Sequence, residues 1–421
     1  MSEARRPALM TLDEAIVLLE AGAAAARIFD VETVSTFDAL GRVLAADLVS
    51  PIDVPPADNS SMDGYAVRGA DVPVAGTVLR VSQRIAAGHV GAPLAAGSAA
   101  RIFTGAQIPM GADAVVMQEQ CDAIGDTEVR INVLPAPGQW IRHRGEDVMQ
   151  GSTVLPRGMR LTPQAMGLAA TVGAATLPVW RRPRVAMLST GDELVMPGTV
   201  APADLPPGAI FNSNRFMLRG LLQAAGCEVT DLGIVPDRLA ETRDALRHAA
   251  VGHDLILSSG GVSVGEEDHI RPAVRAEGRL DLWQLAIKPG KPLAFGAIRR
   301  ADHGKADEAL FMGLPGNPVS GFVTFVLAVA PVVRILQGLP GKALAASPMR
   351  ADFDWSRPDK RREFLRVRRN ASGGLDLFAN QSSGVLTSAV WADGLVDNPP
   401  GQAIRRGDTV GFLAMDGLIG R

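Results

Sequence analysis

Residues 258–269 read SSGGVSVGEEDH and combine two features with opposite electrostatic preferences. Glycines let a backbone come close to a ligand, and free N–H groups at the start of a helix favour negative charge. The small residues of this phosphate-cradle pattern are Gly260, Gly261, Ser263 and Gly265. Three carboxylates follow at residues 266–268 and would repel a bare anion. A Mg²⁺ ion between them resolves the conflict, because it commonly takes one or two carboxylates plus phosphate oxygens.

Three further loops follow predicted strands of the same part of the chain. The strand RVAMLS leads into TGDEL, which contains Glu193, and LWQLAI leads into KPGKP, which contains Lys288 and Lys291. ALFMG leads into LPGNP, where Asn317 and Pro318 are the residue types of a helix N-cap and first helical position. Ligands of open α/β sheets bind outside the carboxyl ends of the strands, so the four loops together predict one site.

The residue types in these loops indicate Mg²⁺-dependent chemistry on a phosphate-containing ligand. Asp268 and Glu193, from neighbouring loops, are the predicted Mg²⁺ ligands. Lys288 and Lys291 would neutralise the remaining anionic oxygens. Each loop alone has an ordinary alternative, namely a glycine turn, a solvated acidic pair or an exposed lysine turn. The functional interpretation therefore depends on all four loops meeting at one edge of the sheet.

The chain divides into segments with different hydrophobic periodicity. Strands alternating with helices of 10–15 residues predict a doubly wound, mostly parallel central α/β domain, and short runs between Gly and Pro predict β-rich regions. The fold class is multidomain α/β plus β. The predicted domains are an N-terminal helix and linker segment at 1–50, a β-rich domain at 51–147, a connecting segment at 148–183 that returns to the linker region, an α/β domain at 184–338 and a small C-terminal β-barrel-like domain at 346–421.

Composition excludes several classes of protein. The 421 residues are 47% apolar and 21% charged, as in soluble proteins, and the net charge of −3 gives no reason to expect nucleic acid or a membrane surface as partner. Two cysteines and six histidines without CxxC or HxxxH spacing predict neither a disulfide framework nor a zinc site. The apolar run at 321–336 is short and contains Arg334, so it predicts a buried helix. Since the N-terminus lacks a signal-peptide pattern, we expect a cytoplasmic protein.

Polar loops also occur in the β-rich region. Asp58, Asn59 and Asp63 precede the predicted strand GYAV, while Thr104 lies in RIFTGAQIP and Asp147 in RHRGEDV. Each loop alone is typical of a turn, and GYAV is typical of an edge strand. A helix beginning near residue 11 is also expected, because Thr11 and Glu14 have capping-box spacing; the residue types alone assign no function to these segments.

Seven motifs resemble, in order and approximate spacing, those of the molybdopterin molybdenumtransferases, the family that includes the E domain of gephyrin. The motifs are DNSSMDGYAVR, RIFTGAQIPMGADAVVMQE, RGEDV, STGDEL, SSGGVSVGEEDH, KPGKPLAFG and GLPGNPVS. The resemblance runs from about Thr11 to the C-terminus. It implies a Mg²⁺-dependent enzyme that inserts molybdenum from molybdate into adenylylated molybdopterin and releases AMP, in the last step of molybdenum cofactor biosynthesis.

The resemblance also implies roles for individual residues of the α/β domain and the C-terminal domain. Glu193 and Asp268 match the positions that hold Mg²⁺ near the nucleotide phosphates, and Lys288 and Lys291 match the basic pair near molybdate. Asp237 resembles another acidic position of the cleft. Arg361, in KRREF, and Ser383, in NQSSG, resemble the contribution of the C-terminal domain to molybdate binding.

In the β-rich domain, Asp63, Thr104 and Asp147 resemble polar residues that reach a site completed across a dimer, so a homodimer is implied. This chain departs from the family pattern at Gln284, where relatives often carry a basic residue, and at His269, where tyrosine is common. Arg361 rather than Arg362 is assigned to the oxyanion on the R-x-E-F spacing alone.

Two other functions fit parts of the sequence. The α/β domain resembles that of the nucleotidyltransferase that adenylylates the pterin, although that domain normally stands alone, without β-rich neighbours. A binding scaffold is the other alternative, but it would not need the acidic and basic residues. Molybdopterin adenylyltransferase is a candidate partner of the enzyme, and the sequence does not distinguish molybdate from tungstate.

Overall fold

The computed structural model describes residues 9–262, 269–300, 307–341 and 344–419. These residues form two compact units. The larger unit consists of residues up to 32, residues 41–43 and residues 180–421; the smaller unit consists of residues 33–40 and 44–179. The predicted domain boundaries remain predictions, because the two units do not correspond to them one by one.

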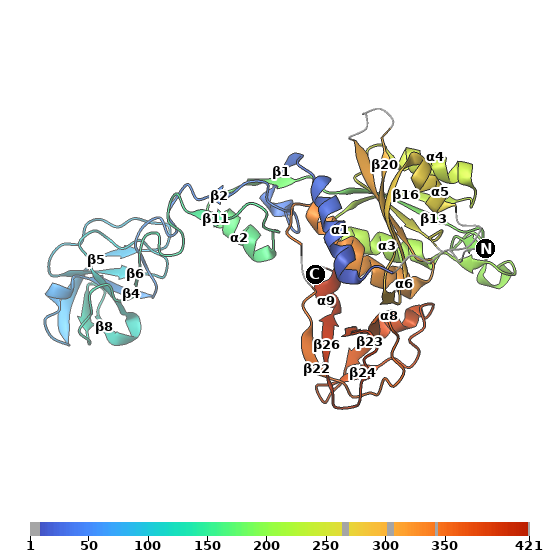
Figure 1. Cartoon of the computed structure of the whole chain (residues 1–421). Helices are drawn as coiled ribbons and strands as arrows, with labels where there is room; N and C mark the ends of the chain where they lie inside the picture. Colours follow the sequence, from blue (N-terminus) through green and yellow to red (C-terminus); the bar gives the residue numbers. More distant parts are fainter. Residues whose placement is uncertain (1–8, 263–268, 301–306, 342–343, 420–421) are drawn as a thin grey trace, which may run out of the picture. The chain divides into compact units, whose positions relative to one another are not determined.

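A six-stranded sheet lies at the centre of the larger unit (Figure 1), in the order β16-β13-β17-β21-β20-β18. Its strands are β13 (Arg184–Thr190), β16 (Glu228–Val235), β17 (Leu255–Ser259), β18 (Gly278–Gln284), β20 (Pro292–Arg299) and β21 (Glu308–Leu314). The first four strands in that order pair in parallel, and β20 runs antiparallel to both of its neighbours. Strand β18 therefore has the same direction as β21, and the carboxyl ends of five strands share one edge.

This mixed, mostly parallel sheet confirms the predicted fold class. The sequence analysis did not predict strand β20, since it identified only the KPGKP loop that precedes it. Its antiparallel direction places Pro292, at its start, on the same edge as the carboxyl ends of the other strands. The KPGKP loop, between β18 and β20, therefore lies at the predicted edge.

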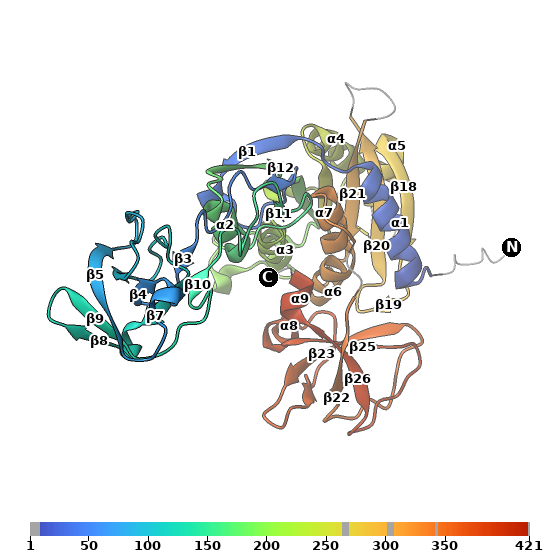
Figure 2. The same cartoon turned by 90° about the vertical axis from the view of Figure 1, so that its left-hand side faces the viewer.

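Helices cover both faces of this sheet (Figure 2). The helices are α1 (Leu12–Ala25), α3 (Ser213–Ala224), α4 (Leu239–Ala250), α5 (Ile270–Glu277), α6 (Pro318–Thr324) and α7 (Ala330–Leu336), with a π-helical segment, η5 (Phe325–Val329), joining the last two. Alternate residues of β13 point to opposite faces. Val185 and Met187 pack with α1, α3, α6 and α7, while Ala186 and Leu188 pack with α4 and α5.

The apolar segment Pro318–Leu336 lies in the core of the larger unit. It is the one helix in the described ranges that is long and apolar enough to span a membrane, but 78% of its most apolar window is buried inside the protein. The predicted buried helix is therefore confirmed. The predicted capping box at the start of α1 is confirmed as well, since the Thr11 hydroxyl accepts from the Glu14 N–H at 3.2 Å and the Glu14 carboxylate accepts from the Thr11 N–H at 3.0 Å.

The C-terminal part of the larger unit contains a second sheet, in the order β19-β23-β25-β26-β22, with β24 paired to β23. Its strands are β19 (Ile287–Lys288), β22 (Ser347–Arg350), β23 (Arg362–Arg369), β24 (Leu375–Leu377), β25 (Gly394–Asn398) and β26 (Thr409–Ala414). Strand β19 comes from the KPGKP loop, so this loop joins the two sheets. Two short helices, α8 (Leu386–Trp391) and α9 (Met415–Ile419), were not predicted in this otherwise β-rich region.

The smaller unit is built around another six-stranded sheet, in the order β7-β4-β6-β5-β9-β8. The strands are β4 (Gly64–Val67), β5 (Thr77–Ile85), β6 (Ser98–Ile102), β7 (Ala114–Met117), β8 (Cys121–Ile124) and β9 (Glu128–Ile131). The predicted strand GYAV is confirmed, but the ordinary interpretation of it as an edge strand is wrong. It forms β4, which lies between β6 and β7 because its residues at 64, 66 and 67 are buried on both sides of the pleat.

The rest of the smaller unit has its own apolar core around helix α2 (Pro163–Thr171), where Leu44, Leu155 and Val179 are buried. The chain passes between the units within β1, on both sides of residues 41–43 and at the end of β12. The remaining short strands of the smaller unit, the first and last of which extend into the larger unit, are β1 (Val31–Ser35), β2 (Leu48–Val49), β3 (Asn59–Ser60), β10 (Ile141–Arg142), β11 (Thr153–Leu155) and β12 (Thr176–Trp180). The larger unit also contains the short strands β14 (Leu194–Val195) and β15 (Ile210–Phe211).

A largely shielded ion pair holds the amino ends of β13 and β17 together. The Arg181 guanidinium donates to both carboxylate oxygens of Asp254 at 2.9 Å, and its Nε donates to Asp30 at 3.1 Å. The side chains of Arg181 and Asp254 are only 13% and 15% exposed. Asp254 also accepts from the Arg184 N–H at 2.7 Å. Removal of the guanidinium would leave a carboxylate that is mostly shielded from water without its cation.

We predict that Arg181→Met lowers the free energy of unfolding of the larger unit by about 3 kcal/mol, because breaking one side of a buried pair costs more than the pair contributes. Urea denaturation followed by tryptophan fluorescence measures this change. The control is Arg184→Met, whose partner Glu228 is 3.5 Å away and half exposed; it should cost less than about 1 kcal/mol. Equal losses in the two variants would contradict the prediction.

Candidate active site

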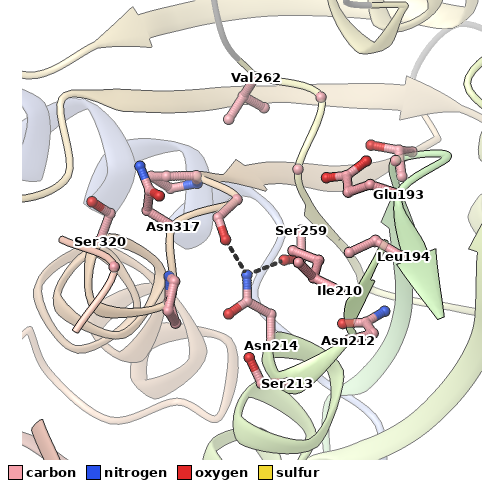
Figure 3. A pocket seen from close by; sticks show the side chains of 18 of the residues that line it. Glu193, Leu194, Ile210, Asn212, Ser213, Asn214, Ser259, Val262, Asn317 and Ser320 are labelled. Atoms are coloured by element: carbon pink, nitrogen blue, oxygen red, sulfur yellow. Dashed lines mark hydrogen bonds between the residues drawn. The ribbon is translucent and has the colours of Figure 1, made fainter. Parts of the chain in front are cut away.

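A pocket of about 690 Å³ opens at the carboxyl edge of the central sheet (Figure 3). It is formed by the ends of β13, β17 and β21, by the start of α3 and α6, and by one loop of the C-terminal region. The lining residues are Thr190, Gly191, Glu193, Leu194, Ile210, Phe211, Asn212, Ser213, Asn214, Asp237, Ser259, Gly260, Gly261, Val262, Pro292, Pro315, Gly316, Asn317, Pro318, Ser320 and Gly384. Of the predicted site residues, the pocket brings together Glu193, Asp237, Gly260, Gly261 and Asn317.

The glycines after β17 are required by the backbone. Gly260 and Gly261 have φ angles of +90° and +65°, a region that L side chains rarely adopt. An added Cβ would lie 2.5 Å from the Thr190 carbonyl oxygen at Gly260, and 2.6 Å from Ile270 at Gly261. The turn therefore packs directly against the end of β13, and its backbone lines the pocket without side chains in between.

Asn214, near the start of α3, joins two of the loops that line the pocket. Its amide nitrogen donates to the Ser259 hydroxyl at 3.1 Å and to the Gly316 carbonyl at 2.7 Å (Figure 3). The residue is only 8% exposed. Both bonds bridge segments more than 40 residues apart in the sequence, so Asn214 holds the glycine turn against the LPGNP loop.

Two carboxylates line the pocket, Glu193 after β13 and Asp237 after β16. Gly191 makes room for Glu193, since an added Cβ there would lie 2.5 Å from the Glu193 carboxylate. In the described part of the chain Glu193 forms no ion pair, and no group of three or more His, Cys, Asp or Glu side chains could hold a metal among themselves. This donor set fits Mg²⁺, which needs only one or two carboxylates when a phosphate supplies further oxygens.

Helix α6 begins at the pocket with Asn317 as its N-cap and Pro318 at its first position, as predicted. The Asn317 side chain makes no capping hydrogen bond and lines the pocket instead. The Val319 N–H donates to the Ser383 carbonyl at 3.0 Å. The predicted residue Ser383 therefore lies against the start of α6, and its neighbour Gly384 closes one side of the pocket.

Lys288, in β19, and Arg361, directly before β23, are both predicted as oxyanion ligands, and they share one carboxylate. Lys288 Nζ is 3.5 Å from Asp359 Oδ2 and 3.3 Å from Glu363 Oε1. Arg361 donates to both oxygens of Asp359, from Nε at 2.9 Å and from Nη2 at 2.8 Å. This guanidinium holds the pKa of the Asp359 carboxyl well below its usual range, so Asp359 is charged at neutral pH.

The two candidate arginines face different partners. Arg362 forms two bonds of 2.6 Å with Asp397 and one of 3.0 Å with Asp13, so it ties β23 to β25 and α1. Arg361 shares Asp359 with Lys288 and lies beside the KPGKP loop, with Nη1 3.4 Å from the Ile287 carbonyl. The geometry groups Arg361, not Arg362, with the predicted lysine.

Lys291 follows Lys288 in the same loop and precedes Pro292, which lines the pocket. No carboxylate of the described ranges lies within ion-pair distance of its ammonium. Its carbonyl accepts from the Leu285 N–H at 2.8 Å, which fixes the ends of the loop. Of the two predicted lysines of this loop, Lys291 is thus the one that forms no ion pair with the described residues.

In the smaller unit, Asp63 and Thr104 are in direct contact. The Thr104 N–H and hydroxyl donate to Asp63 Oδ1 at 2.8 and 2.7 Å, and both bonds lower the pKa of the Asp63 carboxyl. Asp147 is exposed, and its N–H donates to the Val54 carbonyl at 2.9 Å. No described contact joins Asp147 to the Asp63–Thr104 pair.

Three predicted residues, Ser263, Gly265 and Asp268, lie outside the described residues, so the structure describes only Glu193 of the predicted Mg²⁺ pair. Conversely, sequence reasoning missed Asn214, Asp359 and Glu363. Asn214 could have been noticed as a second asparagine at a helix start on the predicted edge. Asp359 lies two residues before Arg361, but nothing in its spacing indicates a contact with Lys288, which is 71 positions away.

Comparison with known proteins gives the same family for each part of the chain. Residues 10–173 match the model of the MoeA N-terminal region (domain I and II), residues 186–335 match a probable molybdopterin binding domain, and residues 348–415 match the MoeA C-terminal region (domain IV). The molybdopterin molybdenumtransferase of Haemophilus influenzae is 44% identical over 301 residues, which is 72% of this chain and 72% of that protein.

A second relative, molybdopterin molybdenumtransferase 2 of Mycobacterium tuberculosis, is 36% identical over 379 residues, or 87% of this chain and 90% of that protein. The crystal structure of a molybdopterin biosynthesis MoeA protein from Pyrococcus horikoshii superposes with a TM-score of 0.81 at 29% identity and covers 97% of this chain and 100% of that chain. The sequence motifs, the fold and these relatives agree: the chain belongs to the molybdopterin molybdenumtransferase family, a family of transferases of molybdenum cofactor biosynthesis.

Proposed function

We propose that this enzyme inserts molybdenum from molybdate into adenylylated molybdopterin and releases AMP, in a Mg²⁺-dependent reaction that completes molybdenum cofactor biosynthesis. The observation that supports this most directly is the juxtaposition of two kinds of site in the larger unit. One is a pocket with a glycine turn and two carboxylates, and the other is a pair of cations at Lys288 and Arg361. The KPGKP loop connects them.

The pocket binds the phosphates of the adenylylated pterin. Gly260 and Gly261 bring main-chain atoms to its wall, and Asn214 keeps this turn in place against the LPGNP loop. Glu193 and Asp237 are the described residues that would hold Mg²⁺, which supplies charge neutralisation for the phosphate oxygens as AMP leaves. The start of α6 faces the same space and favours negative charge there.

The oxyanion is bound at the other end of the loop. The positively charged side chains that would contact molybdate are those of Lys288, Lys291 and Arg361. Ser383 lies next to the start of α6. The proposal includes a cytoplasmic homodimer, in which Asp63 and Thr104 of one copy contribute to the reaction of the other. Size-exclusion chromatography with light scattering tests the dimer.

The defining experiment measures AMP release from adenylylated molybdopterin at fixed Mg²⁺, with and without molybdate. We expect release that depends on molybdate and that EDTA abolishes. Release without molybdate would indicate simple hydrolysis, and consumption of ATP would indicate the nucleotidyltransferase. If the pterin binds but no AMP is released with either molybdate or tungstate, the transferase proposal is wrong.

Replacement of Lys288 should chiefly affect molybdate. We predict that Lys288→Ala raises the molybdate concentration for half-maximal AMP release at least about tenfold, which corresponds to about 1.4 kcal/mol, because the variant removes a cation that would contact the dianion. The matched control is Lys360→Ala, which removes the same charge from an exposed position one residue before Arg361. A similar rise in both variants would show a general charge effect and contradict a binding role for Lys288.

Replacement of Glu193 should chiefly affect Mg²⁺. We predict that Glu193→Gln raises the Mg²⁺ concentration needed for half-maximal AMP release by about tenfold, because an amide binds Mg²⁺ less strongly than a carboxylate. Glu228→Gln, at the exposed opposite end of the sheet, is the control. If Glu193→Gln has a normal circular dichroism spectrum and an unchanged Mg²⁺ requirement, Glu193 is not a ligand of the metal.

A further inference from the structure

Lys288 and Arg361 are part of a continuous row of alternating charges. The row is Arg361, Asp359, Lys288 and Glu363, with contacts of 2.8 Å, 3.5 Å and 3.3 Å between successive side chains. Two cations and two carboxylates make the formal charge of the row zero. A dianion loses its hydration when it enters a binding site, and an excess of positive charge offsets that cost. In this arrangement the row offers no such excess.

The two carboxylates of the row are held in different ways. Glu363 is completely buried, and its Oε2 accepts from Trp355 Nε1 at 2.8 Å and from Asn398 Nδ2 at 3.3 Å. It is also the direct register partner of Lys288 in the parallel pair β19–β23. Glu363 is therefore a fixed part of the sheet and keeps the Lys288 ammonium in position.

Asp359 differs from Glu363 in its partners, because among the described residues its carboxylate contacts only Arg361 and Lys288, the two cations of the row. It lies before β23, outside the strand, and its carboxylate is bonded to the guanidinium and backbone N–H of Arg361 and lies next to Lys288. Its side chain is 20% exposed, and the Lys288 side chain is 41% exposed. A rotation of the Asp359 side chain would expose both cations to solvent without disturbing any strand.

The contacts of Asp359 are those that an oxyanion would make. Planar guanidinium groups bind carboxylates and tetrahedral oxyanions through the same pair of donors, and an ammonium adds a third contact. We propose that the Asp359 carboxylate occupies the oxyanion position between Arg361 and Lys288 and competes there with molybdate. The Asp359 carboxylate thereby selects for dianions, because the electrostatic attraction of a monovalent anion to the two cations is no stronger than that of Asp359 itself. This inference rests on the proposed function of Lys288 and Arg361.

The test is direct binding of molybdate to the full-length protein by isothermal titration calorimetry, without the pterin. We expect Asp359→Asn to bind molybdate at least about fivefold more tightly than the wild type. This factor corresponds to the repulsion between two unit negative charges about 4 Å apart in bulk water, which the variant removes. The side chain keeps its size, so the shape of the site is retained. A purely structural role for Asp359 would weaken binding and could not strengthen it.

The matched control is Asp397→Asn. Asp397 forms the same two-bond pair with Arg362 that Asp359 forms with Arg361, but it does not contact Lys288. Its removal should leave molybdate affinity within about twofold of the wild type. Asp359→Glu, which retains the charge, should not show the gain. Thermal unfolding of each variant establishes that the protein is folded in the titration.

The inference is overturned if Asp359→Asn binds molybdate equally or more weakly, or if Asp397→Asn gains as much affinity. These outcomes are distinct from a failure of the proposed function. If the proposed function is wrong, neither the wild type nor Asp359→Asn would bind molybdate, and the wild type would release no AMP when molybdate is added. Molybdate-dependent AMP release by the wild type together with unchanged affinity in Asp359→Asn would overturn only the role of Asp359.

Discussion

The larger unit depends on the burial of the apolar helical segment Pro318–Leu336 against the central sheet. Side chains such as Val323, Leu327 and Val333 are almost fully buried in the core shared with β13, β17 and β21. Burial of this much apolar surface is the main favourable term in folding, and it fixes the segment in one position. Because the helix begins directly after β21, its first turn must lie at the carboxyl edge of the sheet. The pocket follows from this constraint, since that edge also carries the glycine turn after β17.

In the second sheet, the pairing of charged side chains, rather than the burial of apolar surface, determines where Lys288 lies. A completely buried carboxylate such as Glu363 is costly unless a cation and hydrogen-bond donors accompany it. Trp355 and Asn398 supply the donors, and Lys288 supplies the charge. A lysine held for this reason is well positioned but electrically compensated. A row that also contains Arg361 and Asp359 therefore combines precise placement of the cations with a low net attraction for anions.

The sequence was sufficient for features that depend on local patterns. Alternating strands and helices, the capping box at Thr11 and the N-cap at Asn317 were predicted because each is determined by residues close in the chain. The convergence of Glu193, Gly260 and Asn317 on one pocket was also predictable, since parallel strands end at a common edge. The antiparallel direction of β20 could not be predicted, because it depends on which strands β20 pairs with. The contacts of Asp359 and Asn214 were missed for the same reason: they join segments 71 and 102 residues apart, and spacing carries no information about such pairs.

The short strand β19 connects the two sheets of the larger unit through one loop. Its two residues leave the α/β region and pair with β23, so that Lys288 is held by the second sheet while Pro292, four residues later, lines the pocket of the first. Four residues span at most about 14 Å, so the position of the cations relative to the pocket is limited by the length of the KPGKP loop. An α/β domain alone could retain the glycine turn and the carboxylates. It would lack Glu363 to hold the lysine and Arg361 to complete the pair, and thus the part of the site proposed to receive the oxyanion.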